Sequence, residues 1–220
     1  MIKAKYTVHE QKGFTIVELM IGTAVLSTIL VLATVTMAGI GRLYYKGINQ
    51  AKIQNAVRTI ANDVVQNIQV GSDVVVGPVS GSGASAQMKA YCIGKIRYSY
   101  IPGVKMGDTD GGITYQHVFW RDTISSGCSP ANLAQGDPSS GYGGVKGTEL
   151  MSPNSRLTRF TISLTSQGTY GVDVAAAYGD GDLLDLTTNP NNPTCRGDIG
   201  DQFCATASLQ TKAVRRLDLN

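Results

Sequence analysis

A single acidic residue, Glu18, lies near the start of an otherwise uncharged apolar run from Phe14 to Gly41. The run has 28 residues, more than the roughly 20 that an α-helix needs to cross the core of a bilayer. A carboxylate near the end of such a helix costs free energy on insertion, so we interpret Glu18 as functional and expect a partner for it. An uncleaved single-pass anchor would explain the apolar length but gives no reason for Glu18.

The residues around the start of the run carry a resemblance to a known family. A short leader containing Lys3, Lys5 and Lys12 precedes the stretch Gly13-Phe14-Thr15-Ile16-Val17-Glu18-Leu19-Met20. This arrangement resembles the class III signal of type IV prepilins and pseudopilins. The resemblance covers residues 1 to about 70, and it implies the processing and assembly that this family undergoes.

In that family a membrane-embedded aspartic peptidase cuts after the glycine, here Gly13, and usually methylates the new N-terminus, here the amine of Phe14. The resemblance therefore implies a leader of residues 1–13 and assembly through Phe14 and Glu18. The apolar run is kept after the cut, whereas the shorter run of an ordinary secretory signal is discarded.

The chain becomes amphipathic after the apolar run. Apolar residues at spacings of 3 and 4 fall on one face of a helix, and the polar residues between them mostly face away. This apolar stripe comprises Ile53, Val57, Ile60, Val64 and Ile68. No proline occurs before Pro78, so one helix can continue from Phe14 to about Val70. The expected weak points of this helix are Gly39, Gly41 and Gly47.

Beyond Gly71, turn residues alternate with short strand-like segments, which is typical of an antiparallel sheet. The candidate strands are Ile96–Ile101, Ile113–Arg121, Leu157–Leu164, Thr169–Tyr178 and Leu209–Leu217. Segments Gly77–Gln87 and Gly127–Gly147 are rich in Gly, Ser and Pro and are predicted as loops. Within Thr169–Tyr178, apolar residues alternate with small or polar ones, so one face of this strand can pack on the apolar stripe.

The predicted fold class is therefore α+β. A long N-terminal helix, membrane-spanning in its first half and amphipathic in its second, packs on a C-terminal antiparallel β-sheet head with disulfides. The predicted parts are the leader at 1–13, the membrane or filament-core helix at 14–41, the amphipathic helix at 42–70 and the head at 71–220.

Four cysteines, Cys92, Cys128, Cys195 and Cys204, lie outside the apolar run and lack the spacing of a zinc or redox site. We interpret them as disulfides, which require an oxidising compartment outside the cytoplasm. Three pairings are open. We favour Cys195–Cys204 with Cys92–Cys128, because the first pair closes a short loop rich in turn residues.

The sequence offers little support for catalysis or for nucleic-acid binding. His117 is the one histidine left after the leader, and we interpret it as structural, so no enzyme activity is expected. The net charge of +3 falls to +1 once the leader is removed. We interpret the basic residues near the C-terminus as a solvated face, not a nucleic-acid track. These basic residues are Lys212, Arg215 and Arg216.

Two acidic turns and one tripeptide are further candidates for ligand binding. The turn Gly107–Gly112 and the stretch containing Asp180, Asp182 and Asp185 could supply carboxylates to calcium, and the second is the better candidate. Ordinary turns explain both, so we expect no cofactor. The tripeptide Arg196-Gly197-Asp198 is expected by chance.

The resemblance and the large head favour a type IV pilin-like structural subunit of the minor class. A helix-breaking proline of the kind many major pilins carry is missing here. Such a subunit would take part in pilus assembly, adhesion or DNA uptake, with other pilin subunits and the prepilin peptidase as its partners. It would sit in the cytoplasmic membrane with its head outside, and on the cell surface after assembly. A type II secretion pseudopilin is the alternative within this class, and a membrane-anchored adhesin or ligand-binding module that never polymerises is the alternative outside it.

Overall fold

The computed structural model describes residues 13–71, 75–81, 87–110, 112–125, 127–130, 147–166, 168–185, 188–190, 192–197 and 200–216. The chain divides into two compact units, Met1–Leu43 and Tyr44–Asn220. A single helix, α1 (Ile16–Val70), contributes to both units, and none of its glycines interrupts it. The boundary lies two residues beyond the predicted end of the apolar run, and the amphipathic residues of α1 belong to the second unit, which we call the head.

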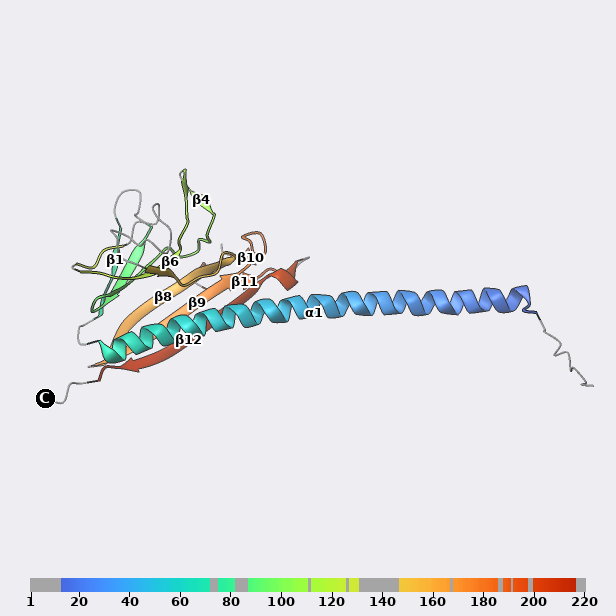
Figure 1. Ribbon diagram of the computed structural model, residues 1–220, viewed down its shortest axis with the longest axis horizontal. Coiled ribbons are helices and arrows are strands. Elements are labelled where there is room, and N and C mark those ends of the chain that lie inside the picture. Colours follow the sequence, from blue (N-terminus) through green and yellow to red (C-terminus); the bar gives the residue numbers. More distant parts are fainter. Residues whose placement is uncertain are drawn as a thin grey trace, which may run out of the picture. The chain divides into compact units, whose positions relative to one another are not determined.

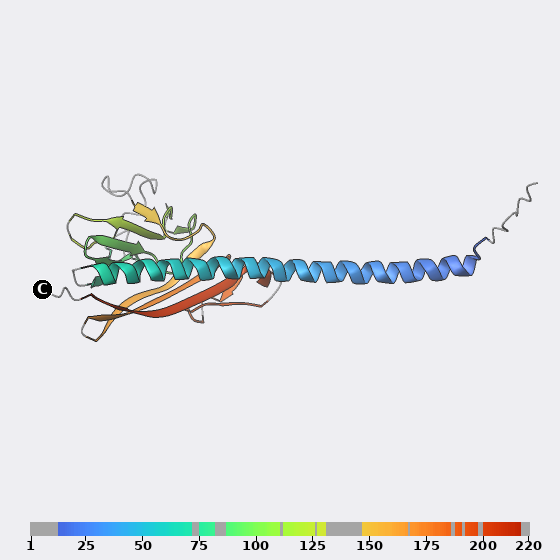
Figure 2. The same cartoon turned by 60° about the horizontal axis from the view of Figure 1, so that its bottom comes forward.

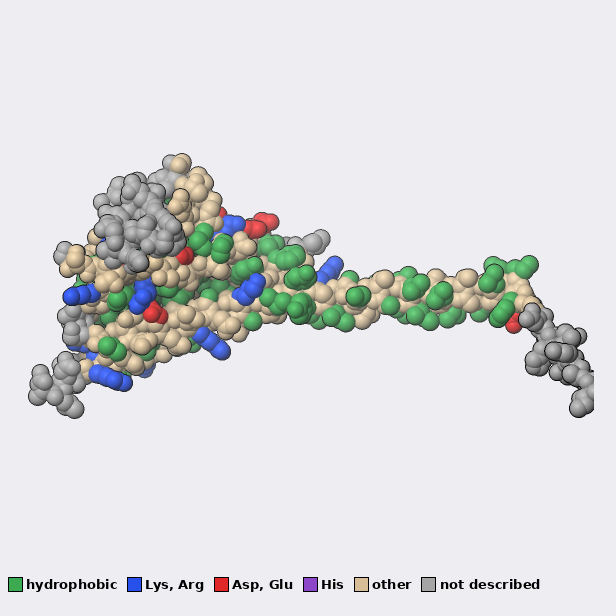
Figure 3. Space-filling model, viewed as in Figure 1, with side chains coloured by type: hydrophobic (Ala, Val, Ile, Leu, Met, Phe, Trp, Pro, Cys, Tyr) green, Lys and Arg blue, Asp and Glu red, His purple; other side chains and the backbone are tan. Residues whose placement is uncertain are grey.

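In the first unit, the side chains of residues 13–40 are all exposed, including the large apolar ones. Figure 3 shows apolar side chains along this part of α1. Its hydroxyl groups bond back to the helix: Thr23 Oγ1 donates to the Met20 carbonyl at 3.0 Å, and Ser27 Oγ donates to the Ala24 carbonyl at 2.8 Å. Lipid hydrocarbon offers a hydroxyl group no hydrogen-bond partner. Because these hydroxyls are already bonded within their own helix, they can lie in an apolar surrounding.

The described residues of the head form four antiparallel sheets, and Figure 1 draws their strands as arrows. The five-stranded sheet has the order β1-β2-β3-β6-β7, and the three-stranded sheet has the order β12-β9-β8. The strands of the first are β1 (Val75–Ser80), β2 (Lys89–Ile93), β3 (Ile96–Tyr100), β6 (Phe119–Thr123) and β7 (Gly147–Glu149). Those of the second are β8 (Ser155–Ser166), β9 (Thr169–Tyr178) and β12 (Ala205–Val214). Among the described residues, two further pairs of short strands are β4 (Thr109–Asp110) with β5 (Ile113–Thr114), and β10 (Leu184–Asp185) with β11 (Thr194–Cys195).

The head part of α1 runs alongside the three-stranded sheet in both views (Figures 1 and 2). All five residues of the predicted apolar stripe are buried, and they belong to the same core cluster as Tyr170, Val172 and Val174 of β9. The prediction of a helix packed on an antiparallel sheet is therefore confirmed. Burial of such a stripe is the main stabilising contribution that α1 can make to the head.

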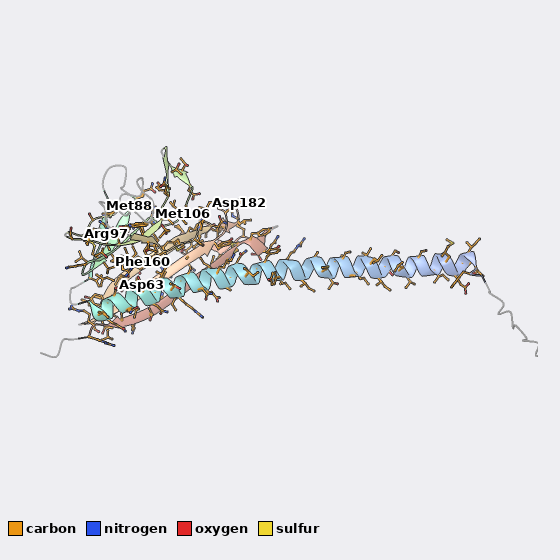
Figure 4. The ribbon with its side chains drawn as sticks, in the orientation of Figure 1. Asp63, Met88, Arg97, Met106, Phe160 and Asp182 are labelled. Atoms are coloured by element: carbon orange, nitrogen blue, oxygen red, sulfur yellow. A yellow bond between two sulfur atoms is a disulfide. The ribbon has the colours of Figure 1, made fainter. Side chains whose placement is uncertain are left out.

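Phe160 of β8 joins the two large sheets (Figure 4). Its ring lies 5.2 Å from that of Tyr100 and 5.0 Å from that of Phe119, measured between centroids, and both partners belong to the five-stranded sheet. Tyr91 and Tyr98 lie at 5.4 and 6.1 Å from the same ring. Edge-to-face and tilted contacts of this kind are favourable beyond the area they bury.

A polar network fastens α1 to the five-stranded sheet. The hydroxyl of Tyr98 donates to Asp63 Oδ2 at 2.6 Å and accepts from Asn67 Nδ2 at 2.7 Å. Arg121 Nε lies 3.0 Å from the same Asp63 oxygen. The network fixes which face of α1 meets β3 and β6. Apolar burial alone would define the rotation of α1 about its axis less sharply.

The predicted loop Gly77–Gln87 is wrong in its first part, because residues 77–80 belong to β1. β1 is an edge strand, where the missing N–H of Pro78 breaks no ladder bond on the outer side. At Gly77, φ is +134°, and a Cβ there would lie 2.7 Å from the Ala90 carbonyl oxygen. The glycine is thus required by the close approach of β2. Residues 82–86 lie outside the described residues.

The predicted strand Ile113–Arg121 is also wrong, because the structure divides it between β5 and β6. Tyr115 N donates to the Asp108 carbonyl at 2.9 Å, which keeps Tyr115 with the preceding hairpin. The Glu149 carboxylate then accepts from Val118 N at 2.9 Å and from Phe119 N at 3.0 Å, in place of a strand partner. No local periodicity encodes such a side-chain acceptor.

The remaining strand predictions differ mainly in their ends. The prediction for Thr169–Tyr178 coincides with β9, whereas β12 begins at Ala205, four residues before the predicted start. β12 follows Cys204 directly and pairs with β9 over its whole length, from Ala205 with Tyr178 to Val214 with Thr169. Leu217, the predicted end of that strand, lies outside the described residues, as do residues 131–146 of the predicted loop Gly127–Gly147.

Candidate functional site

Glu18 closes a capping box at the start of α1. Its carboxylate oxygen Oε2 accepts from Thr15 N at 3.0 Å and from Thr15 Oγ1 at 2.9 Å. In return, Glu18 N donates to Thr15 Oγ1 at 3.2 Å. These reciprocal bonds satisfy two of the amide donors that the first turn of a helix leaves unpaired. Glu18 thus has a local structural role as well as the assembly role expected from the resemblance.

The capping partner Thr15 is not among the residues predicted from the sequence, although the sequence contains the signal for a capping box. Thr15-Ile16-Val17-Glu18 has the Ser/Thr-x-x-Glu spacing of a capping box directly before an apolar run. Both bonds from Thr15 reach the same carboxylate oxygen, Oε2. Among the residues that the structure describes, the other oxygen, Oε1, accepts no hydrogen bond, which leaves it for an incoming cation.

An open groove of about 240 Å³ runs from Phe14 past Glu18 along one face of the helix. Gly22 lies in it, and a Cβ at Gly22 would meet nothing within 4 Å, so no contact within this chain calls for a glycine there. Small residues in an apolar medium let a second helix approach closely. The groove is lined by Phe14, Glu18, Leu19, Gly22, Thr23 and Leu26.

The four cysteines form the two disulfides Cys92–Cys128 and Cys195–Cys204, the pairs favoured from the sequence. Next to the first, Arg97 forms a buried ion pair with Asp122 and donates from Nη1 to the Ser129 carbonyl at 2.8 Å. The ion pair therefore ties the residue after Cys128 to β3 and β6. A buried charge of this kind requires its partner, so the two act as a unit.

The second disulfide closes a loop over a small separate cluster containing Ala177, Leu184 and Cys204. Arg196, the first residue of the Arg-Gly-Asp tripeptide, is held against the start of β10, where its N donates to the Leu183 carbonyl and its Nε to the Leu184 carbonyl. Asp198 lies outside the described residues. The structure thus gives Arg196 an intramolecular role.

The calcium candidates do not converge among the described residues, where no three acidic, histidine or cysteine side chains form a cation site. Asp180 pairs with Lys105, and this ammonium group lowers the pKa of the Asp180 carboxyl. Asp185 Oδ1 instead accepts from Thr188 N at 3.1 Å, as in an ordinary turn.

His117 is buried beside the ring of Trp120, with 4.5 Å between ring centroids. Its Nδ1 lies 3.7 Å from Glu149 Oε2, while the same carboxylate accepts from the backbone amides of Val118 and Phe119 at the start of β6. Asp122, its acidic neighbour in the sequence, is engaged by Arg97. This placement gives His117 a packing role.

Comparison with known families gives one match. The family described as the prokaryotic N-terminal methylation motif matches residues 9–34, which include Gly13, Phe14 and Glu18. The chain carries a type IV pilin-like class III signal. No curated protein and no solved structure matches the chain.

The match to the methylation motif gives the start of α1 a functional context and supports a type IV pilin- or pseudopilin-like protein. Gly13 and Phe14 precede the helix, and the Phe14 side chain is exposed. By length and composition α1 can cross a membrane, and its apolar window is uncovered by the rest of the chain. The signal and the apolar helix together indicate a membrane-anchored protein.

Proposed function

We propose that this protein is a structural subunit of a type IV pilin-like filament, a minor pilin that takes part in pilus assembly, adhesion or DNA uptake. The observation that carries the proposal is the exposed carboxylate of Glu18, which lines an open groove on an apolar helix. A subunit of this kind works by packing and needs neither a catalytic residue nor a cofactor.

The proposed assembly step is an ion pair between subunits. Processing after Gly13 would create a cationic amine on Phe14, and helices leaving the lipid would bring this amine to Glu18 of a neighbour. Because Oε2 is held by Thr15, the carboxylate is already oriented and Oε1 can receive the amine. Pairing would neutralise two charges that are unfavourable in an apolar filament core.

The proposed location is the cytoplasmic membrane before assembly, with a single pass and the head outside the cytoplasm. The two disulfides support this orientation, because such bonds persist in oxidising compartments. After assembly the head would face the cell exterior on a filament, and the prepilin peptidase would act on the leader beforehand.

A pseudopilin of a type II secretion system shares all these features. Neighbouring genes separate the two, since a retraction ATPase indicates a pilus and an outer-membrane secretin with secretion genes indicates secretion. A membrane-anchored adhesin that stays monomeric is the candidate from another class. It would tolerate changes at Glu18 that a filament subunit would not.

Three variants test the assembly step. Glu18→Gln keeps an oxygen acceptor at the capping position and removes the charge, Glu18→Ala removes both, and Thr15→Ala weakens the cap while keeping the charge. We expect all three to insert in the membrane and to be cleaved. Incorporation into sheared filaments, measured by immunoblot, should fall roughly tenfold or more for both Glu18 variants and remain close to wild type for Thr15→Ala.

Each other pattern has a distinct meaning. Normal incorporation of Glu18→Gln with failure of Glu18→Ala and Thr15→Ala would assign Glu18 to the helix cap and contradict the ion pair. Normal incorporation of all three would contradict the assembly role of Glu18, whereas absence of the wild-type chain from sheared filaments would favour the monomeric adhesin.

A further inference from the structure

Three aromatic side chains remain exposed together at one end of the head. Tyr44 and Tyr45 lie on α1, with 6.1 Å between their ring centroids, and Phe203 lies 6.1 Å from Tyr45. Their exposed fractions are 66, 55 and 49%, whereas the other phenylalanines of the head, Phe119 and Phe160, are buried. We call Tyr44, Tyr45 and Phe203 the aromatic base.

Phe203 comes from a distant part of the chain and is fixed in this position. It ends the short helix η3 (Asp201–Phe203), whose three residues each contact α1. Asp201 forms an ion pair with Lys46, the Gln202 carbonyl accepts from Asn49 Nδ2 at 3.0 Å, and the Phe203 ring meets Tyr45. In Figures 1 and 2 the segment before β12 lies beside α1.

The next residues of the chain strengthen this attachment. Cys204 is bonded to Cys195, and Gly179 approaches the turn so closely that a Cβ there would lie 2.9 Å from the Phe203 carbonyl oxygen. Phe203 is therefore exposed because an anchored turn holds it in this position, and not because it belongs to a flexible loop. An apolar side chain held in this way is favourable only where something other than water covers it.

The sequence places two members of the aromatic base, Tyr44 and Tyr45, shortly after the apolar run. Phe14 to Gly41 spans roughly 42 Å at 1.5 Å per residue, which matches the thickness of about 40 to 45 Å of a bilayer with its headgroups. Tyr44 follows three residues later. Tyrosine side chains concentrate at this depth because the ring prefers hydrocarbon and the hydroxyl prefers water.

We propose that the aromatic base lies in the outer headgroup layer of the membrane and seats the head on the lipid surface before assembly. The inference rests on insertion of the apolar run, which the proposed function also requires. Tyr44 and Tyr45 would anchor the helix at the boundary. Phe203 would add a contact from the other end of the sequence, so that the head as well as the helix meets the lipid.

Fluorescence quenching in vesicles tests the proposal with the full chain. Phe203→Trp introduces an indole into the aromatic base, while the single native tryptophan, Trp120, is buried and serves as a constant background. Leu164→Trp is the matched control, because Leu164 is 65% exposed. Leu164 pairs with Tyr170 of β9, whereas Ala205, which follows the turn with Phe203, pairs with Tyr178. The eight residues of β9 between these two positions correspond to a separation of roughly 25 Å.

The vesicles contain phosphatidylcholine and phosphatidylglycerol, with or without bromine on the acyl chains near the headgroup, and acrylamide is the aqueous quencher. After subtraction of the wild-type signal, bromolipid should remove about half or more of the emission of the indole at position 203 and little of that at position 164. Acrylamide should show the opposite preference. If Phe203→Trp fails to form the Cys195–Cys204 bond, Tyr44→Trp provides a second reporter on α1.

The outcomes distinguish this inference from the proposed function. Retention in the membrane after carbonate extraction, with an indole at position 203 that acrylamide quenches as strongly as the control, overturns the lipid contact alone. Release of the wild-type chain by carbonate overturns both. Protection of position 203 that appears only at high protein-to-lipid ratio assigns the aromatic base to a second copy of the chain and contradicts the lipid contact.

Discussion

At the scale of single residues, Tyr98 illustrates how one polar group can position an element. Its side chain is fully buried, yet its hydroxyl meets Asp63 and Asn67, which both lie on the partly exposed side of α1. The buried ring fills the core under the helix. The hydrogen bonds of the hydroxyl fix the rotation of α1 about its axis relative to β3. Apolar burial supplies most of the stability, and the hydrogen bonds supply the orientation.

Replacing this hydroxyl should destabilise the head. We expect Tyr98→Phe to lower the free energy of unfolding by about 1 to 3 kcal/mol, because Asp63 and Asn67 lose a partner while the ring is kept. Asp63→Asn, which keeps an oxygen acceptor for Tyr98 but loses the charge facing Arg121, should cost less. Urea unfolding of the two variants and wild type measures both values. Equal stability of Tyr98→Phe and wild type would show that the network contributes no net stability.

At the scale of elements, the sequence is informative where burial follows a simple period. The stripe of α1 and the alternation along β9 were both predictable because one face of each packs on the core. β2 was missed because four of its five residues are buried, so it has no alternation to detect. Contacts between distant residues, such as Lys46 with Asp201, have no local signal at all.

The candidate site shows the same difference between features with a local sequence signal and contacts between distant residues. Gly13, Phe14 and Glu18 lie within eight residues of sequence and could be identified from it, whereas the aromatic base combines residues about 160 positions apart. The turn that presents Phe203 depends on Asn49, Lys46 and the Cys195–Cys204 bond acting together. Only a three-dimensional arrangement reveals it.

The loop closed by Cys195 and Cys204 should stabilise the head. A closed loop of about ten residues restricts the unfolded chain by about 2 to 3 kcal/mol in the chain-entropy account. The double variant Cys195→Ser, Cys204→Ser should therefore melt roughly 5 to 10 °C below wild type in a calorimetric scan. The single variants, each leaving a free thiol, are best compared under reducing conditions. An unchanged melting temperature would mean that the contacts of η3 with α1 hold the turn without the disulfide.

At the scale of the whole molecule, the two units differ in what stabilises them. The described side chains of the first unit bury almost nothing, so its helix depends on an apolar surrounding such as lipid or neighbouring helices. The head contains the buried core, the disulfides and the buried ion pair. Substitutions in the apolar run should consequently alter insertion and assembly, while those in the head should alter unfolding.

The buried tyrosines of the head predict how its stability depends on pH. Burial raises the pKa values of Tyr91, Tyr98 and Tyr100, and the carboxylate of Asp63 raises that of Tyr98 further. In the unfolded chain these hydroxyls ionise near pH 10, so above that pH the unfolded state loses protons that the folded state keeps. Their contribution is thus fully present below about pH 10 and is lost as the pH rises above it.

Each such tyrosine should lower the free energy of unfolding by at most about 1.4 kcal/mol per pH unit above pH 10. Urea unfolding of the detergent-solubilised protein at pH 8, 9, 10 and 11, with brief incubation, should therefore show constant stability up to about pH 9 and a decline beyond pH 10. Tyr98→Phe starts lower at neutral pH but should decline less steeply, because one titrating hydroxyl is gone. Parallel declines of the variant and wild type would show that Tyr98 ionises no later in the folded head than in the unfolded chain, contrary to the burial that the structure assigns to it.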